Sequence, residues 1–193
     1  MAKVAAETER LILRDWEAED EKRFYDIMNT PVVMENLGGL QTPEEWHEAF
    51  VRISGFTRDW GHTFWIVEDK ESGEILGFCG LKRVNAPGAG DLTGTPEIGW
   101  RLRDSAWGKG IAKEAAIASL DLAFGKFGYE TVIAMTSTRN LASQGLMIRL
   151  GMERREDMDF WDTRFGPDLN PAIVWALDAA DWPKARAALG SPR

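Results

Sequence analysis

The segment Trp107-Gly-Lys-Gly-Ile-Ala-Lys-Glu-Ala115 has the residue types and spacing best suited to binding an anion. It follows a strand-like run, Glu97-Ile-Gly-Trp-Arg-Leu102, and opens a long alanine-rich helical pattern. Glycines at such a junction let backbone N–H groups approach a ligand closely, and the helix dipole attracts negative charge there. Lys109 and Lys113 add positive charge. This segment therefore predicts a pyrophosphate-binding turn.

The spacing of this turn leaves a second interpretation open. It lacks the Gly-Lys-Ser/Thr ending of a P-loop and the full spacing of a dinucleotide fingerprint, so an ordinary glycine turn before a helix fits it equally well. The chain has a net charge of −8, yet Arg101, Arg103, Lys109 and Lys113 lie close together with one acidic neighbour, Asp104. Such a basic island indicates a local anionic ligand, and a solvated loop of mixed charge is the alternative.

Length and composition narrow the class of protein. A chain of 193 residues fits one domain, so we expect a single domain over residues 1–193. The sequence has no apolar run long enough to span a membrane and no signal-peptide pattern, which predicts a cytoplasmic protein without a membrane partner. The acidic charge argues against nucleic-acid binding. A monomer and a homodimer are equally compatible with the sequence.

The residues that most often bind metals or form disulfides are scarce. Cys79 is the only cysteine, so an internal disulfide is excluded. Its apolar surroundings in the sequence favour a buried, inert thiol over a nucleophile. Neither His47 nor His62 has a second ligand at metal-binding spacing, so we expect no metal site.

Hydrophobic periodicity and turn residues predict strands and helices throughout the chain. Thr42-Pro43 with Glu45 has the pattern of a helix start with a capping box, and Asn140 and Gly151 have the patterns of a helix cap and a helix stop. A helix between two strand patterns indicates a βαβ unit, which makes strands 97–102 and 131–136 parallel. The expected strands are 8–14, 63–68, 74–84, 97–103, 131–136, 152–160 and 172–177, and the expected helices are 17–28, 42–60, 111–127, 141–150 and 182–189.

The order of these motifs resembles the Gcn5-related N-acetyltransferase (GNAT) superfamily, and more closely its RimJ/RimL-like branch, the relatives of ribosomal-protein-alanine N-acetyltransferases. The resemblance implies an α/β (α+β) GNAT fold with a mixed central sheet of about six to seven strands flanked by helices. In this fold a parallel pair of strands splays around the acyl-CoA. The segments that carry the resemblance are 8–14, 97–102, 107–115, 140–143 and 150–152.

The resemblance also assigns acetyl-CoA as the cosubstrate and places its binding site. Trp107 stands where the family's loop usually has Gln or Arg, which leaves the backbone amides of Gly108 to Lys113 to hold the CoA pyrophosphate. Asn140 matches the asparagine beside the pantetheine arm, and Ser143 matches a serine that assists the departing thiolate. The expected cofactor-binding residues are Trp100, Leu102, Trp107, Gly108, Lys109, Gly110, Ile111, Ala112, Lys113, Asn140 and Ser143.

The implied reaction is direct attack of a primary amine on the thioester, for which the amine must lose a proton. Glu97 is the candidate base, and an exposed strand-start carboxylate without a catalytic role is the alternative. Ser143 is the candidate acid, and a serine that bonds its own backbone at a helix start is the alternative. A backbone amide between Trp100 and Leu102 would stabilise charge on the thioester oxygen. Asp157, Asp159 and Asp162, beside Phe160 and Trp161, are candidates for receiving a cationic amine.

Three classes of function remain open. The first is an acetyl-CoA-dependent N-acetyltransferase that acts on a protein N-terminus or a small amine. The second is a non-catalytic module that binds and senses acyl-CoA, and the third is an interaction scaffold whose glycine turn binds nothing. Turnover that depends on an added amine separates the first from the second, and CoA binding separates both from the third.

Overall fold

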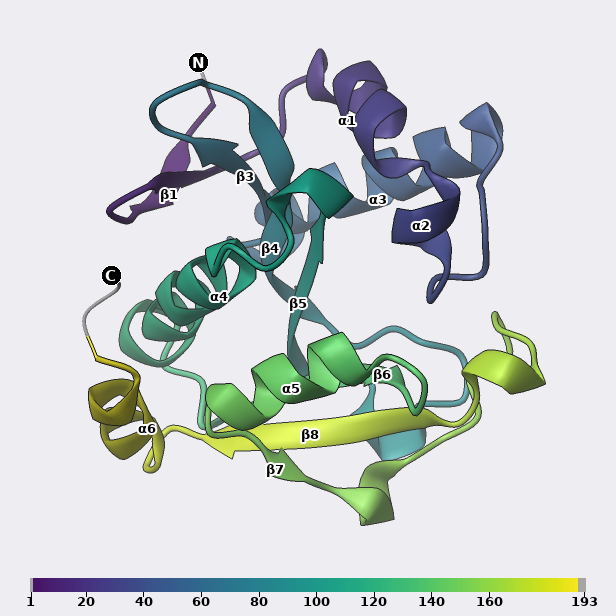
Figure 1. Ribbon diagram of the computed structural model, residues 1–193. Helices are drawn as coiled ribbons and strands as arrows, with labels where there is room; N and C mark the ends of the chain where they lie inside the picture. Colours follow the sequence, from purple (N-terminus) through teal and green to yellow (C-terminus); the bar gives the residue numbers. More distant parts are fainter. Residues whose placement is uncertain (1, 191–193) are drawn as a thin grey trace.

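The computed structural model of the protein describes residues 2–190, which form one mixed sheet with helices on both of its faces (Figure 1). The strand order is β1-β2-β3-β4-β5-β6-β8-β7, and all neighbours are antiparallel except β5 and β6. The sheet has eight strands rather than the expected six to seven, because the short edge strand β1 extends it. The strands are β1 (Val4–Glu7), β2 (Leu11–Arg14), β3 (Phe64–Asp69), β4 (Ile75–Arg83), β5 (Pro96–Leu102), β6 (Thr131–Ser137), β7 (Glu153–Arg154) and β8 (Ala172–Asp178).

Five α-helices lie between these strands along the chain, and a sixth follows β8, within the described residues. They are α1 (Asp20–Met28), α2 (Pro31–Met34), α3 (Pro43–Trp60), α4 (Ile111–Asp121), α5 (Leu141–Arg149) and α6 (Trp182–Leu189). Short 3₁₀ turns occupy Gly90–Leu92, Asp104–Ala106, Glu156–Met158 and Pro167–Leu169, and a π-helical turn occupies Leu122–Lys126.

Local side-chain chemistry sets several of the helix ends, as the sequence predicts. At the start of α3, Thr42 Oγ1 accepts a hydrogen bond from the Glu45 amide, and the Glu45 carboxylate accepts one from the Thr42 amide. At the start of α5, Asn140 Oδ1 accepts a hydrogen bond from the Ser143 amide at 3.1 Å. After α5, Gly151 has a φ of 81°, which glycine adopts without strain. Both expected caps and the expected stop are confirmed.

Four expected boundaries are wrong, each for a local reason. The first strand is a hairpin, because the chain turns at Thr8, which bonds to Leu11. The helix expected from residue 17 starts at Asp20, whose carboxylate accepts a hydrogen bond from the Glu17 amide in the turn before the helix. The helix expected over 111–127 changes to a π-helical turn after Asp121. The strand expected over 152–160 stops at Arg154, because Asp159 pairs with Arg154 and accepts from the amide of Val174, so the chain folds back.

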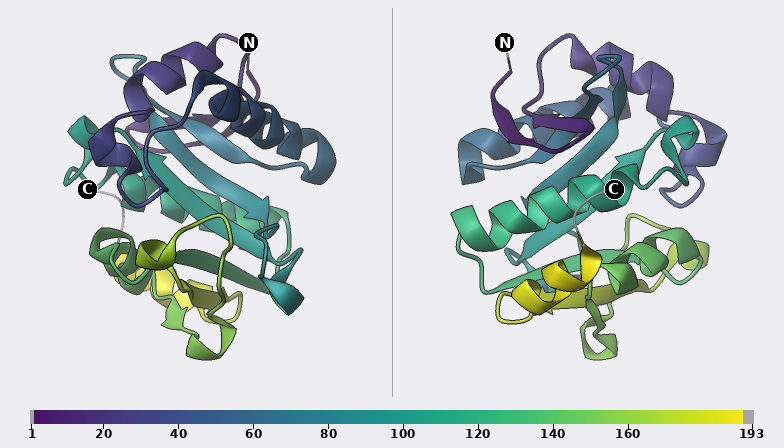
Figure 2. Two further views of the ribbon diagram at one scale, coloured as in Figure 1. Left: turned by 90° about the vertical axis from the view of Figure 1, so that its right-hand side faces the viewer. Right: turned by 60° about the vertical axis from the view of Figure 1, so that its left-hand side comes forward.

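The central strands are buried on both faces, and their alternate side chains enter two separate cores. On one face α4 packs over Trp65, Val67 and Leu81 in a core that also includes Ile98 and Leu102. On the other face α1, α2 and α3 pack over a second core. The two views of Figure 2 show α4 and the α1–α3 group on opposite sides of the strands. The residues of this second core are Phe24, Met28, Val33, Met34, Trp46, Phe64, Ile66, Ile75 and Phe78.

The parallel pair β5 and β6 is joined at one end only. Its single register pair is Glu97 with Ile133, and beyond that point the two strands diverge (Figure 1). Helix α4 lies on one side of the opening, and α5 follows β6 on the other. This is the expected splayed arrangement, and it leaves one edge of β5 free beside the start of α4.

Cys79 is fully buried in the core under α4, as expected, and touches the Ser119 hydroxyl at 3.6 Å. Burial raises the pKa of the Cys79 thiol to about 12, so the nucleophilic thiolate is scarce at neutral pH. No helix among residues 2–190 combines the length and apolar character needed to cross a bilayer.

His62 is a buried histidine whose proton uptake opposes folding. Its Nδ1 donates to the Leu81 carbonyl at 2.9 Å, so its Nε2 accepts from the Tyr129 hydroxyl at 2.6 Å. Burial, opposed by the bond to Leu81 and reinforced by the positive charge of Arg83, lowers the pKa of His62 below its ordinary 6.5. The imidazole therefore stays neutral in the folded chain under weakly acidic conditions, while the unfolded chain takes up a proton there.

We expect this difference to lower the free energy of unfolding as pH falls below about 6.5, by about 1.4 kcal/mol for each unit by which folding lowers the His62 pKa. The loss stops once pH is below the folded-state pKa. Urea titrations across this range, compared between the wild type and His62→Gln, isolate the contribution of His62. Identical pH slopes in the two proteins would contradict it.

Candidate active site

The glycine turn before α4 has the geometry of an anion-binding site. Gly108 and Gly110 have φ values of 71° and 77°, in the left-handed region that favours glycine, and α4 starts at Ile111. A Cβ at Gly108 would meet no atom within 4 Å, so the space beside this turn is open. The first amides of α4 have no intrahelical acceptors and point out of the helix at this end. These residues fit a diphosphate, because main-chain donors and open space coincide there.

An ion pair between the half-buried Arg10 and the buried Glu114 holds the turn against the N-terminal hairpin. Glu114, in the first turn of α4, accepts hydrogen bonds from the Thr8 hydroxyl and from the Arg10 amide and side chain. The same Arg10 guanidinium donates to the Lys109 carbonyl at 3.0 Å. Burial alone would raise the pKa of Glu114, but these hydrogen bonds and the charge of Arg10 lower it below its ordinary value. Arg10 therefore holds the turn through the carbonyl of Lys109 and leaves the main-chain amides of the turn free to bind a ligand.

We expect Glu114→Gln to loosen this turn. Loss of the carboxylate leaves Arg10 half-buried without its partner, which lowers the free energy of unfolding by about 1–3 kcal/mol. We expect CoA affinity to fall about tenfold, because the amides of the turn are no longer held in place. Calorimetric CoA titration and urea unfolding measure the two effects, and Glu48→Gln on the exposed surface of α3 is the matched control. Wild-type CoA affinity in Glu114→Gln would show that the Arg10–Glu114 ion pair, here called the clamp, does not support the turn.

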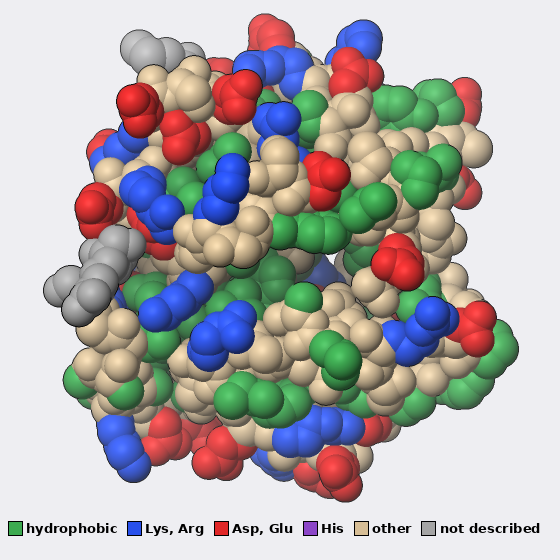
Figure 3. Space-filling model, in the orientation of Figure 1, with side chains coloured by type: hydrophobic (Ala, Val, Ile, Leu, Met, Phe, Trp, Pro, Cys, Tyr) green, Lys and Arg blue, Asp and Glu red, His purple; other side chains and the backbone are tan. Residues whose placement is uncertain are grey.

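A cavity of about 520 Å³ extends from this turn along the free edge of β5 to the start of α5. All of the expected cofactor-binding residues line it except Lys109, whose side chain is exposed and whose carbonyl is held by Arg10. Trp107 is 49% exposed and lines this cavity, and its Nε1 donates to the Leu102 carbonyl at 2.8 Å. Figure 3 shows a hollow near the centre of this face, with Lys and Arg side chains beside it.

The free edge of β5 presents main-chain donors to this cavity. The Arg103 amide donates to the Leu76 carbonyl in β4 at 2.9 Å. Because alternate residues of a strand direct their amides to the same side, the amides of Arg101 and Gly99 also face β4. The amides of Trp100 and Leu102 then face the opening between β5 and β6. This supplies donors at the position where the sequence places stabilisation of the thioester oxygen.

A second cavity, of about 270 Å³, adjoins the first and contains Glu97. Glu97 is 8% exposed, and its Oε2 lies 2.6 Å from Nζ of Lys82, the residue directly opposite it on β4. The contact is an ion pair without the alignment of a hydrogen bond. Glu97 is thus a buried carboxylate beside a cavity rather than an exposed residue at a strand start.

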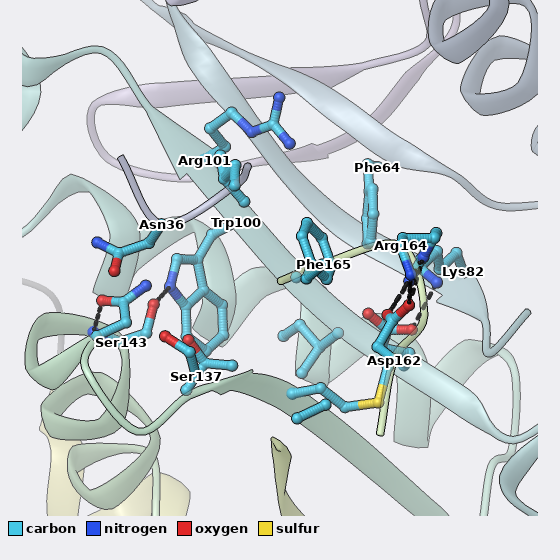
Figure 4. Close-up of a pocket in the computed structure, with 18 of the residues that line it drawn as sticks. Asn36, Phe64, Lys82, Trp100, Arg101, Ser137, Ser143, Asp162, Arg164 and Phe165 are labelled. Carbon is cyan, nitrogen blue, oxygen red and sulfur yellow. Dashed lines mark hydrogen bonds and ion pairs between the residues drawn. The ribbon is translucent and has the colours of Figure 1, made fainter. Parts of the chain in front are cut away.

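The two cavities meet at the start of α5. Trp100, Asn140 and Ser143 line both of them, together with Asn36, Leu37 and Arg101. The Ser143 hydroxyl accepts a hydrogen bond from Trp100 Nε1 at 3.2 Å across this junction (Figure 4). Ser143 therefore bonds across to β5 instead of to its own backbone. The Asn140 side chain is engaged as the helix cap, which holds this end of α5 beside the junction.

The acidic segment after β7 does not present free carboxylates. Asp157 pairs with Arg155 at 2.8 Å, Asp159 pairs with Arg154, and Asp162 pairs with Arg164 at 2.6 Å. Asp162 and Arg164 still line the second cavity together with Phe160, whereas Trp161 is 54% exposed and lies outside it. The expected cation-binding cluster of three aspartates is therefore not formed in this structure, because arginines of the same segment neutralise each carboxylate.

Several residues of the site had no signal in the sequence pattern. Lys82 becomes the partner of Glu97 only through the register of β4 and β5. Arg10 and Glu114 are 104 positions apart. Arg149 at the end of α5 and the segment after α2 also line the larger cavity. The hairpin and the chain reversal that bring these residues together are tertiary features.

Comparison with known proteins places the chain in a family. Residues 10–153 match the family model described as acetyltransferase (GNAT) domain. The chain therefore belongs to the GNAT acetyltransferase family, and the resemblance seen in its motifs is confirmed at this level. Membership of this family supports acyl transfer as the activity.

Individual relatives agree with this placement. The uncharacterized protein YkkB of Bacillus subtilis (strain 168) is 30% identical over 162 residues, which cover 83% of this chain and 92% of that protein. An acetyltransferase from Agrobacterium tumefaciens str. C58 has a TM-score of 0.73 at 25% identity, over 92% of this chain and 95% of its own. The ribosomal-protein-S5-alanine acetyltransferase from Vibrio fischeri has a TM-score of 0.70 at 18% identity, over 93% of this chain and 99% of its own, which shows a shared fold.

Proposed function

We propose that this protein is an N-acetyltransferase that transfers the acetyl group of acetyl-CoA to a primary amine. The observation that carries the proposal is the meeting of the two cavities at Trp100 and Ser143. One cavity begins at an anion-binding turn, and the other contains a buried carboxylate. A long anionic cosubstrate and a small basic acceptor need this pair of compartments, joined where the reacting atoms meet.

The amides from Gly108 to Lys113 would hold the CoA pyrophosphate, and Lys113 would add positive charge beside it. Bound acetyl-CoA supplies an activated thioester. The amides of Trp100 and Leu102 donate toward the opening, where negative charge develops on an acyl oxygen. Asn140 holds the start of α5 in place, so that the Ser143 hydroxyl faces the same junction.

Glu97 takes the role of general base in this proposal. An alkyl amine is largely protonated near neutral pH and must lose a proton before it attacks. Glu97 lines the acceptor cavity with a carboxylate oxygen that makes no aligned hydrogen bond, so it can accept that proton directly or through water. Ser143 takes the role of acid: its hydroxyl passes a proton to the departing sulfur as the C–S bond breaks, and it takes up the proton that the amine nitrogen loses once it is bonded to the carbonyl carbon. Trp100 donates to the serine oxygen, which leaves the serine hydroxyl hydrogen free to point into the junction.

The test is the release of CoA from acetyl-CoA with and without added amines. The panel contains short peptides with Ala or Ser at the N-terminus, polyamines, aminoglycosides and amino acids. The peptides are included because the RimJ/RimL-like motifs favour a protein N-terminus, and the small molecules because the small cavity favours a small amine. Release that depends on an amine supports the enzyme. Tight CoA binding without turnover on any amine would instead identify an acyl-CoA sensor, and no CoA binding at all would leave the scaffold.

A further inference from the structure

The acceptor cavity gathers buried polar atoms that lack hydrogen-bond partners. Among residues 2–190, four buried side-chain nitrogen or oxygen atoms have no such partner, and three of them belong to residues that line this cavity. Burying a polar atom without a partner costs free energy, so native proteins rarely retain one without a functional reason. The three atoms are Glu97 Oε2, which is in an ion pair with Lys82, Arg101 Nε and Ser137 Oγ, and the fourth is Trp175 Nε1.

Arg101 is the most unusual member of this group, because its positive charge has no carboxylate partner among the described residues. Its Nη1 lies 3.8 Å from the sulfur of Met34, and its guanidinium lies 5.3 Å from the centre of the Phe78 ring. Neither neighbour carries a negative charge. Burial lowers the pKa of Arg101 to about 10, so the group is still protonated at neutral pH. The residue as a whole is half-buried, and it lines the cavity.

The charges around the cavity do not balance. Lys82 pairs with Glu97, and Arg164 pairs with Asp162, each at 2.6 Å. Within each pair the two charges cancel. The lining then has two further cationic side chains, Arg101 and the exposed Arg52. A cavity with unpaired positive charge favours a ligand that carries negative charge.

We propose that the acceptor is a small amine that also carries a carboxylate, and that Arg101 binds this carboxylate. The inference rests on the proposed function and names its substrate class. A guanidinium donates two parallel hydrogen bonds to a carboxylate, which would satisfy the Nε left without a partner. A cavity of about 270 Å³ holds a small molecule and is too small for a folded partner.

The arrangement of the lining fits a ligand with two different ends. Figure 4 shows Arg101 on one side of the cavity and the Lys82, Asp162 and Arg164 group on the other, with Phe64 and Phe165 between them. Glu97 pairs with Lys82 and therefore belongs to the second group. The carboxylate of the acceptor would bind Arg101, its apolar chain would pass the aromatic rings, and its amine would face Glu97.

The experiment compares ω-amino acids of increasing chain length with their carboxamides, which keep the size and the amine but lose the charge. Acetyl transfer from acetyl-CoA is followed for each pair, and the ratio of the two kcat/KM values is the readout. For the best chain length we expect the wild type to favour the carboxylate by about tenfold or more, as charge-assisted hydrogen bonds do. We expect Arg101→Met to bring the ratio close to one.

Two further variants control this result. Arg101→Lys keeps the positive charge but loses the planar guanidinium that donates two parallel hydrogen bonds, so we expect an intermediate ratio of the two kcat/KM values. Arg103→Met removes the next arginine of this segment, which pairs with Glu74 and lines neither cavity, so we expect the wild-type ratio. CoA affinity and the melting temperature are measured for every variant. Arg101→Met should match or exceed the wild-type melting temperature, because it removes an unpaired buried charge.

Several results would overturn the inference. Turnover of amines without a preference for carboxylates would refute it and leave the proposed function standing. A marked loss of CoA affinity in Arg101→Met would assign Arg101 to the cofactor instead. A preserved ratio together with a lower melting temperature would give Arg101 a purely structural role, and acetylation confined to peptide N-termini would refute the small acceptor. If no amine of any kind promotes CoA release, the proposed function fails and the inference fails with it.

Discussion

Gly110→Asp is expected to weaken CoA binding by about 100-fold, or about 3 kcal/mol. The substitution places a side chain and a negative charge at the residue before α4, where main-chain amides face open space. Gly110 has a φ of 77°, which aspartate tolerates better than most residues do, so the fold should survive. Isothermal titration calorimetry with CoA measures the effect.

Gly110→Asn is the matched control for this substitution. Asparagine has nearly the same shape as aspartate and also tolerates a positive φ, but it carries no charge. A Cβ at this position would lie 3.5 Å from Nη2 of Arg10, an ordinary van der Waals contact, so neither variant forces the Arg10 side chain to move. We expect Asn to cost less affinity than Asp, and the difference measures the electrostatic term. Wild-type affinity in both variants would remove this turn from the cofactor site.

Glu97→Gln is expected to lower kcat by about 100-fold or more near neutral pH, the range that general-base catalysis contributes. Glutamine keeps the size of the side chain but cannot accept the proton of the incoming amine. CoA affinity should change little, because Glu97 lines the acceptor cavity and not the cofactor cavity. Steady-state rates over a range of pH, combined with CoA titration, separate the two effects. Equal rates for both proteins across the range would make Glu97 a scaffold residue.

The ion pair with Lys82 requires its own control in this experiment. Glu97→Gln leaves Lys82, which is 9% exposed, without its carboxylate partner and with only the hydrogen bond from its Nζ to Asn85 Oδ1, and a loss of activity could arise from that buried charge. Lys82→Met with Glu97 retained tests the converse. We expect Lys82→Met to keep more activity than Glu97→Gln, because the base is still present. The double variant should be as slow as Glu97→Gln alone.

The parts of this fold that could be predicted from the sequence are those fixed by local chemistry. The capping box of Thr42 and Glu45 and the asparagine cap at Asn140 use side chains within three residues of the groups they satisfy. The order of strand, glycine turn and buried helix also predicts the parallel strand pair, and the resemblance to the GNAT superfamily implies the opening beside it. These features depend on contiguous residues, which one sequence contains in full.

The electrostatic partners in the site depend instead on strand register and on chain reversal. Alternation along β5 places Glu97 and Arg101 on one face, but only the pairing of β4 with β5 shows that Lys82 neutralises Glu97. Only the folded chain shows that no carboxylate of residues 2–190 forms an ion pair with Arg101. The hairpin at Thr8 brings Arg10 to the start of α4. The aspartates after β7 have the composition of a cation-binding cluster, yet neighbouring arginines neutralise them.

These contacts indicate that the cofactor side and the acceptor side of the site are built from different kinds of groups. The cofactor side is built from backbone donors and depends on the Arg10–Glu114 clamp for its shape. The acceptor side is built from charged side chains, which include the ion-paired carboxylate of Glu97 and the guanidinium of Arg101, whose Nε has no hydrogen-bond partner. Substitutions on the two sides should therefore have separable effects, on CoA affinity in the first case and on acceptor turnover in the second.

The crystal structure of the protein with bound CoA tests the central claim most directly. We expect the diphosphate oxygens to lie within about 3 Å of the amides between Gly108 and Lys113, the distance of a hydrogen bond. The thiol should reach the junction of Trp100 and Ser143, beside the free edge of β5. A diphosphate bound elsewhere, or a turn at Gly108 and Gly110 blocked by side chains in the complex, would contradict the account.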